Sequence, residues 1–145
     1  MRVISAFVIL TLTGCTKPPA ESAQAKADLG SIVLQYHQYV GEHREPPTHI
    51  DELAEFEAPF GWLQGNATVS SQCTTSLRSG NYVVIWSYNI AEDLQRNESV
   101  ILAYHRDVPT SGGYVAFADG RARSLNKEQF AATDKASPTK ASISD

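Results

Sequence analysis

The sequence has few basic residues and only two cysteines, and it has no long apolar run. Its 145 residues include 12 Lys and Arg against 16 Asp and Glu, and the basic residues form no cluster with interleaved aromatics. Nucleic-acid binding needs such a basic surface to release counterions from phosphates, so we expect no nucleic-acid partner. The length suits one domain with a single modest core.

Sequence motifs for catalysis and for metal binding are also missing. The chain has no Gly-x-Ser-x-Gly elbow and no Cys-x-x-Cys pair, so we expect no enzymatic activity. Among the four histidines there is no His-x-x-x-His pair, and the spacing of His37 and His43 turns them about 240° apart on a helix. We expect surface histidines, with His105 and Asp107 as a solvated pair, and neither a metal nor another cofactor.

The most apolar segment lies near the amino terminus. Residues 3–12 (VISAFVILTL) follow Met1-Arg2; this run has the length of a signal peptide, whereas a membrane-spanning helix needs roughly 20 apolar residues. The next residues, Leu12-Thr13-Gly14-Cys15, resemble the lipobox of bacterial lipoproteins. The resemblance implies cleavage before Cys15 and lipid on its thiol.

This resemblance sets the expected location and organisation. Residues 1–14 would be a lipoprotein signal peptide and residues 15–19 a lipidated tether, which holds the domain on a membrane of the cell envelope, facing the periplasm. Thr16, rather than Asp, follows the cysteine. By analogy with the enterobacterial sorting rule, that residue favours the outer membrane.

The first half of the mature chain predicts helices. Residues 20–43 repeat apolar side chains at three- and four-residue steps, and Gly41 is expected to mark the helix end. Thr48 is expected to cap a short helix through Phe56, and the polar residues 66–81 are expected to form a loop with at most one weak strand. The apolar stripe of the first helix comprises Ala25, Leu29, Ile32, Val33, Tyr36, Tyr39 and Val40.

The second half predicts strands. Residues 81–88, 99–105 and 113–118 are β-branched and aromatic, and Asp119-Gly120 is a hairpin signal that leads into residues 121–125. Asn126, with Gln129, is expected to cap a helix over residues 127–132. The fold class is therefore α+β over residues 20–132, with a long amino-terminal amphipathic helix packed on a three- to four-stranded antiparallel sheet. Residues 133–145 are expected to form a disordered tail.

Three segments together resemble the globular heads of type II secretion pseudopilins and related prepilin-like proteins, and the last of them, residues 125–130, fits the helix that often closes such heads. Residues 36–53 run from a helix through glycine and Pro46-Pro47 into a short leucine-bearing helix, and residues 115–122 (VAFADGRA) resemble the family's V-x-F-A-D-G-x-V hairpin. The resemblance covers residues 25–132 and implies a pilin-like head. Such heads can hold calcium in a loop, for which Asp107 and Asp119 are the carboxylates here, although a dense Asp/Asn loop is missing.

The amino-terminal helix departs from that family. A pilin begins with a long apolar helix that packs into a filament, whereas this one begins with Glu21, Gln24, Lys26 and Asp28. These residues are suited to water. We therefore expect a self-contained, monomeric head on a lipid tether.

The expected function is a membrane-anchored envelope lipoprotein that presents a non-enzymatic interaction domain to an envelope protein. The alternatives are an accessory component of a type II secretion or pilus-like system, and a periplasmic protein that binds a small molecule or metal. Phe60 and Trp62, in a Pro/Gly-framed segment, are candidates for the partner contact, unless they complete the core. Cys73 lacks an intramolecular partner once Cys15 is lipidated, so it is either buried and inert or exposed and able to form a disulfide dimer.

Overall fold

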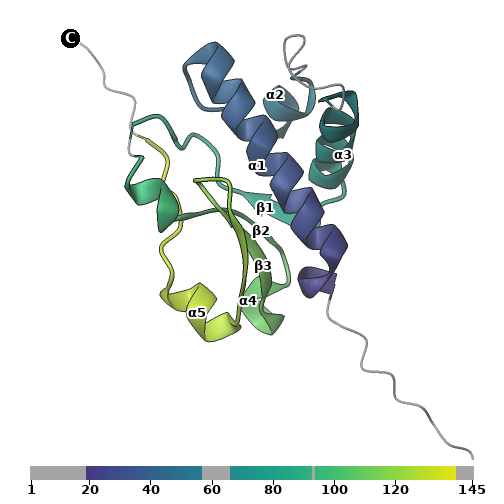
Figure 1. The fold of residues 1–145 in the computed structure, drawn as a ribbon, viewed down its shortest axis with the longest axis vertical. Coiled ribbons are helices and arrows are strands. Elements are labelled where there is room, and N and C mark those ends of the chain that lie inside the picture. Colours follow the sequence, from purple (N-terminus) through teal and green to yellow (C-terminus); the bar gives the residue numbers. More distant parts are fainter. Residues whose placement is uncertain (1–18, 57–65, 93, 140–145) are drawn as a thin grey trace, which may run out of the picture.

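A computed structural model describes residues 19–56, 66–92 and 94–139, and Figure 1 shows an α+β fold, as predicted. Four strands form one antiparallel sheet in the order β1-β2-β3-β4. Within the described ranges, no helix combines the length and apolar character needed to cross a bilayer. In chain order the elements are η1 (Pro19–Glu21), α1 (Ala23–His43), α2 (Ile50–Ala54), α3 (Asn66–Arg78), β1 (Tyr82–Val84), η2 (Arg96–Glu98), β2 (Ile101–His105), α4 (Val108–Ser111), β3 (Gly113–Phe117), β4 (Ala122–Leu125) and α5 (Lys127–Ala132).

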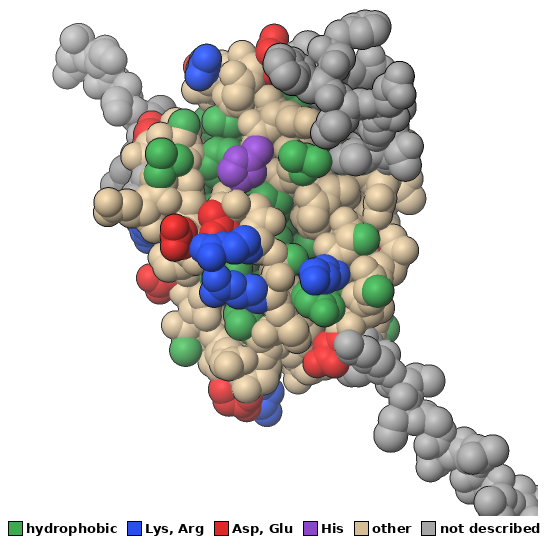
Figure 2. Space-filling view, in the orientation of Figure 1, with side chains coloured by type: hydrophobic (Ala, Val, Ile, Leu, Met, Phe, Trp, Pro, Cys, Tyr) green, Lys and Arg blue, Asp and Glu red, His purple; other side chains and the backbone are tan. Residues whose placement is uncertain are grey.

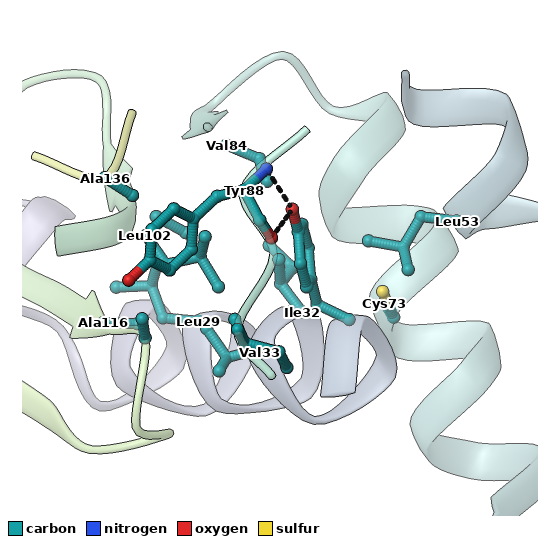
Figure 3. Packing of buried hydrophobic residues seen from close by; sticks show 14 of the residues in the cluster. Leu29, Ile32, Val33, Leu53, Cys73, Val84, Tyr88, Leu102, Ala116 and Ala136 are labelled. Atoms are coloured by element: carbon teal, nitrogen blue, oxygen red, sulfur yellow. Dashed lines mark hydrogen bonds between the residues drawn. The ribbon is translucent and has the colours of Figure 1, made fainter. Parts of the chain in front are cut away.

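The sheet separates two apolar cores. Helix α1 crosses one face with α2 and α3 beside it, whereas α4 and α5 lie against the other face, at the bottom of the view in Figure 1. Because side chains alternate along a strand, β3 contributes Ala116 to the core under α1 and Val115 and Phe117 to the core with α4 and α5. Figure 3 shows Leu29 and Val33 of α1 beside Leu102 and Ala116.

Helix α1 buries the predicted stripe and continues past the predicted end. Leu29, Ile32 and Tyr36 are each 0% exposed. The expectation that Gly41 ends the helix is wrong: α1 runs to His43, and Arg44 takes the left-handed C-cap position with φ 62°. The Arg44 N–H donates to the Val40 carbonyl, so a backbone hydrogen bond fixes this end without the glycine that usually occupies such a position.

A buried tyrosine ties α1 to the chain that follows β1. The Tyr36 hydroxyl donates to the Tyr88 carbonyl at 2.9 Å and accepts from the Tyr88 N–H at 3.1 Å (Figure 3). The Tyr88 hydroxyl in turn donates to Asn97 Oδ1 at 2.8 Å. The described residues between β1 and η2, 85–92 and 94–95, contain no regular element, so these bonds satisfy polar groups that a strand ladder would otherwise pair.

Two predictions in the first half of the chain are wrong. Residues 66–81 were expected to form a loop, but residues 66–78 form α3. Cys73 and Leu77, one helical turn apart, are buried in the core beside α1 and α2, so packing overrides the weak helix propensity of Ser and Thr. The short helix α2 is capped by His49, whose Nδ1 accepts from the Asp51 N–H, instead of by Thr48.

The first strand is shorter than predicted, and the tail pairs with the part of β2 that the longer strand would have covered. Ser87 has φ 60°, so the chain turns away after β1. Beyond that point Ile101 of β2 pairs in parallel with Lys135, donating to the Asp134 carbonyl and accepting from the Ala136 N–H, both at 2.9 Å. The prediction of a disordered tail is therefore wrong for residues 133–139, while residues 140–145 lie outside the described ranges.

Two local predictions near the end of the sheet are confirmed. Gly120 has φ 91° in the turn between β3 and β4, as the Asp119-Gly120 hairpin signal predicts. Asn126 accepts from the Gln129 N–H, and the Gln129 side chain accepts from the Asn126 N–H. This reciprocal capping box fixes the start of α5.

Packing of the tail predicts that a charge at Ala136 is costly. Ala136 is 6% exposed and joins the core under α1, whereas the neighbouring Ser137 is exposed. We expect Ala136→Asp to lower the free energy of unfolding by about 2–4 kcal/mol, because a buried carboxylate loses its hydration. Ser137→Asp is the control and should have little effect in the same urea titration. Equal effects would contradict the packed tail.

The contact between η1 and β3 predicts a second stability difference. Gly113 has φ 141°, and a Cβ there would lie 2.5 Å from the Ala20 carbonyl oxygen. We expect Gly113→Ala to cost about 3 kcal/mol or more through strain and overlap. Gly30→Ala is the control: it meets nothing within 4 Å and should stabilise α1 by up to about 1 kcal/mol. Similar melting temperatures for the two variants would contradict the close approach.

Candidate functional site

A polar pocket lies where α1, α3 and the start of β1 meet. Its volume is about 280 Å³, at the small end of the range for ligand sites. The side chains that line it are carboxylate, amide, hydroxyl and phenol groups, and none is cationic. They are Gln24, Asp28, Ser71, Gln72, Thr75, Ser76, Ser79, Asn81 and Tyr82.

Asp28 is the centre of the pocket. Its Oδ1 accepts from Gln24 Nε2 at 2.7 Å and from Gln72 Nε2 at 3.0 Å, and its Oδ2 accepts from the Tyr82 hydroxyl at 2.6 Å. The residue is only 8% exposed. We expected Asp28 to face water; that expectation is wrong, because α3 covers this part of α1 and supplies Gln72.

The hydrogen bonds determine which groups are charged. Burial raises the pKa of Asp28, but the hydrogen bonds from Tyr82, Gln72, Gln24 and Ser76 together lower that pKa below its ordinary value of 3.8. Burial, followed by the hydrogen bond to Asp28, raises the pKa of Tyr82. At neutral pH the pocket therefore holds a carboxylate anion surrounded by neutral donors.

Tyr82 also connects the pocket to a buried histidine. Its ring packs edge-on against His105 with the centroids 5.4 Å apart, and the two residues are register partners in β1 and β2. His105 is 6% exposed, so the expectation of a solvated His105–Asp107 pair is wrong for the histidine. Its Nδ1 lies 3.6 Å from Asp107 Oδ2.

The other residues that the sequence offers as candidate metal ligands do not come together. His37 is half-buried, and its Nε2 bonds to the Ala118 carbonyl at 2.7 Å, while Asp119 bonds to Arg121. In the part of the chain that the structure describes, no three His, Cys, Asp or Glu residues form a possible metal site. Figure 2 shows acidic and basic side chains beside one another on the face in view, so that face carries no large patch of one sign.

The remaining site predictions have separate outcomes. Cys15, Phe60 and Trp62 lie outside the described residues, so the lipidation and partner-contact assignments stay predictions. Cys73 is free and 0% exposed, and burial raises the pKa of its thiol to about 12. Of the two alternatives for Cys73, the structure supports the buried, inert thiol.

The Asp28 network predicts a pH-dependent cost for losing the phenol. Tyr82→Phe removes one charge-assisted hydrogen bond and should lower the free energy of unfolding at pH 7 by about 1.5–3 kcal/mol. Because the folded-state pKa of Asp28 lies below 3.8, the stability from this carboxylate is present above pH 3.8 and is lost as the pH falls through the folded-state pKa.

The difference between wild type and Tyr82→Phe should therefore shrink in acid. Denaturant titrations at pH 7 and near pH 3 measure it. Tyr104→Phe is the matched control, since Tyr104 packs its ring on Phe130 in the other core. A cost for Tyr82→Phe that does not vary with pH would contradict the role of the phenol as a donor to a carboxylate.

Sequence reasoning missed the pocket because most of its contacts are distant in the chain. Asp28 lies 44 residues from Gln72 and 54 from Tyr82, and α3 was not predicted. Only the four-residue spacing of Gln24 and Asp28 was a local signal.

Comparisons with protein-family models, with curated proteins and with solved structures find no match for this chain.

Proposed function

We propose that this chain is an envelope lipoprotein, held on a membrane by lipid on Cys15, that presents a non-enzymatic, pilin-like interaction domain to a protein partner. The observation that carries the proposal is the Leu12-Thr13-Gly14-Cys15 motif, together with the start of the packed fold shortly after it. Only Cys will serve at position 15, because its thiol accepts the lipid.

The first packed residue supports a short tether. Ala20 is 0% exposed and belongs to the core with Val115 and Phe117. Ala20 is five positions after Cys15, and an extended chain spans at most about 18 Å over that length. A lipid on Cys15 would therefore hold the head close to the membrane surface, with η1 as the point of attachment.

The burial of α1 favours a head that a tether presents over a subunit that assembles into a filament through this helix. The stripe from Leu29 to Val40 packs against the protein's own sheet and α3, so it is not available to neighbouring helices in a filament. The helix-on-sheet arrangement and the Asp119-Gly120 turn agree with the pseudopilin-like passages. An accessory role in a type II secretion or pilus-like system remains the alternative within this proposal.

The anchor is tested by Cys15→Ser. We expect this change to abolish lipid labelling in cells and to leave uncleaved precursor or to release the protein from membranes. Cys73→Ala is the matched control, because it removes the other cysteine of the chain and should leave labelling intact. Membrane retention of Cys15→Ser at the wild-type level would overturn the proposed anchor.

A further inference from the structure

The polar pocket has an uneven supply of hydrogen-bond donors and acceptors. Four of its side chains donate to the same carboxylate: Gln24 and Gln72 through their amide nitrogens, and Tyr82 and Ser76 through their hydroxyls. A glutamine that donates one amide hydrogen in this way retains its carbonyl oxygen with two lone pairs and one N–H, and a phenol that donates its only hydrogen retains only lone pairs. What these groups have left for a ligand is mainly acceptors.

The charge of the pocket also favours a ligand that supplies donors, because it favours a cation. Asp28 is more than nine-tenths buried, and every partner that the structure gives its carboxylate is neutral. The neighbouring cation on α1, Lys26, instead lies over the Tyr114 ring at 5.8 Å. A partly buried charge without an opposite charge produces a stronger field than one in water.

The mouth of the pocket adds further oxygen atoms. Thr75 and Ser79 line it and are exposed. The Ser79 hydroxyl donates to the Ser76 carbonyl and accepts from the Asn81 N–H, which leaves it one lone pair, and the Thr75 hydroxyl can accept as well as donate. A ligand that carries a positive charge and several N–H donors would satisfy both the field and the unused acceptors. A primary ammonium has these properties, and the volume of about 280 Å³ admits only a small molecule or chain end.

We propose that the pocket between α1, α3 and β1 binds the ammonium group of a small primary amine. Asp28 provides the charge and orients Gln24, Gln72 and Tyr82, whose remaining acceptors receive the ammonium hydrogens. The binding of an amine does not depend on the lipid anchor; the choice between its two sources does, because it is tested with the protein on a bilayer. A free amine and the amine headgroup of a lipid carry the same chemistry.

Ethanolamine and ethylene glycol are the probes, because they differ by an ammonium in place of one hydroxyl. The full-length protein in phosphatidylglycerol bilayer discs is titrated with each compound while the backbone amide resonances of residues 72–82 are followed. We expect saturable shifts with ethanolamine and none with ethylene glycol. Equal responses to the two compounds, or no response to either, would overturn the proposal.

Variants locate the binding site and show what it requires. Asp28→Asn keeps the shape and removes the charge, and it should weaken ethanolamine binding at least tenfold. Asp51→Asn, an exposed residue on α2, is the matched control and should bind as the wild type does. Unchanged binding by Asp28→Asn would refute the role of the carboxylate.

A second variant keeps the test valid if Asp28→Asn unfolds. Thr75→Lys leaves the Asp28 hydrogen bonds in place and puts a tethered ammonium at the pocket mouth, so it should compete with ethanolamine and abolish the shifts. Wild-type binding by this variant would overturn the proposed site. Discs that contain phosphatidylethanolamine distinguish the sources: the same shifts without added ethanolamine would identify the headgroup as the ligand, and their absence would identify a free amine.

Discussion

The reciprocal hydrogen bonds between the Tyr36 hydroxyl and the backbone of Tyr88 are the contact on which most of this structure depends. A single side-chain oxygen pairs both backbone groups of a residue that no strand ladder reaches. The Tyr88 hydroxyl then donates to the side chain of Asn97, whose amide nitrogen donates to the Ile90 carbonyl. The backbone carbonyl of Asn97 accepts from the Asp119 N–H. The irregular connection before β2 is thus held between α1 and the β3–β4 turn, because a buried polar backbone group is costly without a partner.

Helix α1 meets its surroundings in two chemically different ways. Near its start, Asp28 is covered by amides and a phenol from α3 and β1, whereas near its end Tyr39 stacks on His43 and meets Phe56 edge-on. The apolar stripe between these ends supplies most of the burial. In the amine site proposed above, the polar start provides the charge that selects the ligand, since the arrangement of its donors depends on Asp28. The apolar middle provides stability.

The elements predicted from the sequence are those with a local signal. The stripe of α1, the Asp119-Gly120 turn and the Asn126–Gln129 capping box each depend on residues a few positions apart, and the structure has all three. Helix α3 was missed because its Ser/Thr-rich sequence has low helix propensity. Among the side chains of α3 that the structure describes, the buried apolar ones are Cys73 and Leu77 alone. The pocket depends on α3, so no local pattern could reveal it.

The pairing of Ile101 with Lys135 also determines when the domain can finish folding. Residues 134–136 pair with the edge of β2 that β1 leaves open. This part of β2 therefore has no hydrogen-bond partner on that side until residues 134–136 have emerged from the ribosome. A chain released only as far as α5 would hold an exposed Ile101 N–H and an incomplete core under α1, a condition in which strand edges pair with other chains. The native state therefore becomes accessible only after almost the whole domain has been synthesised.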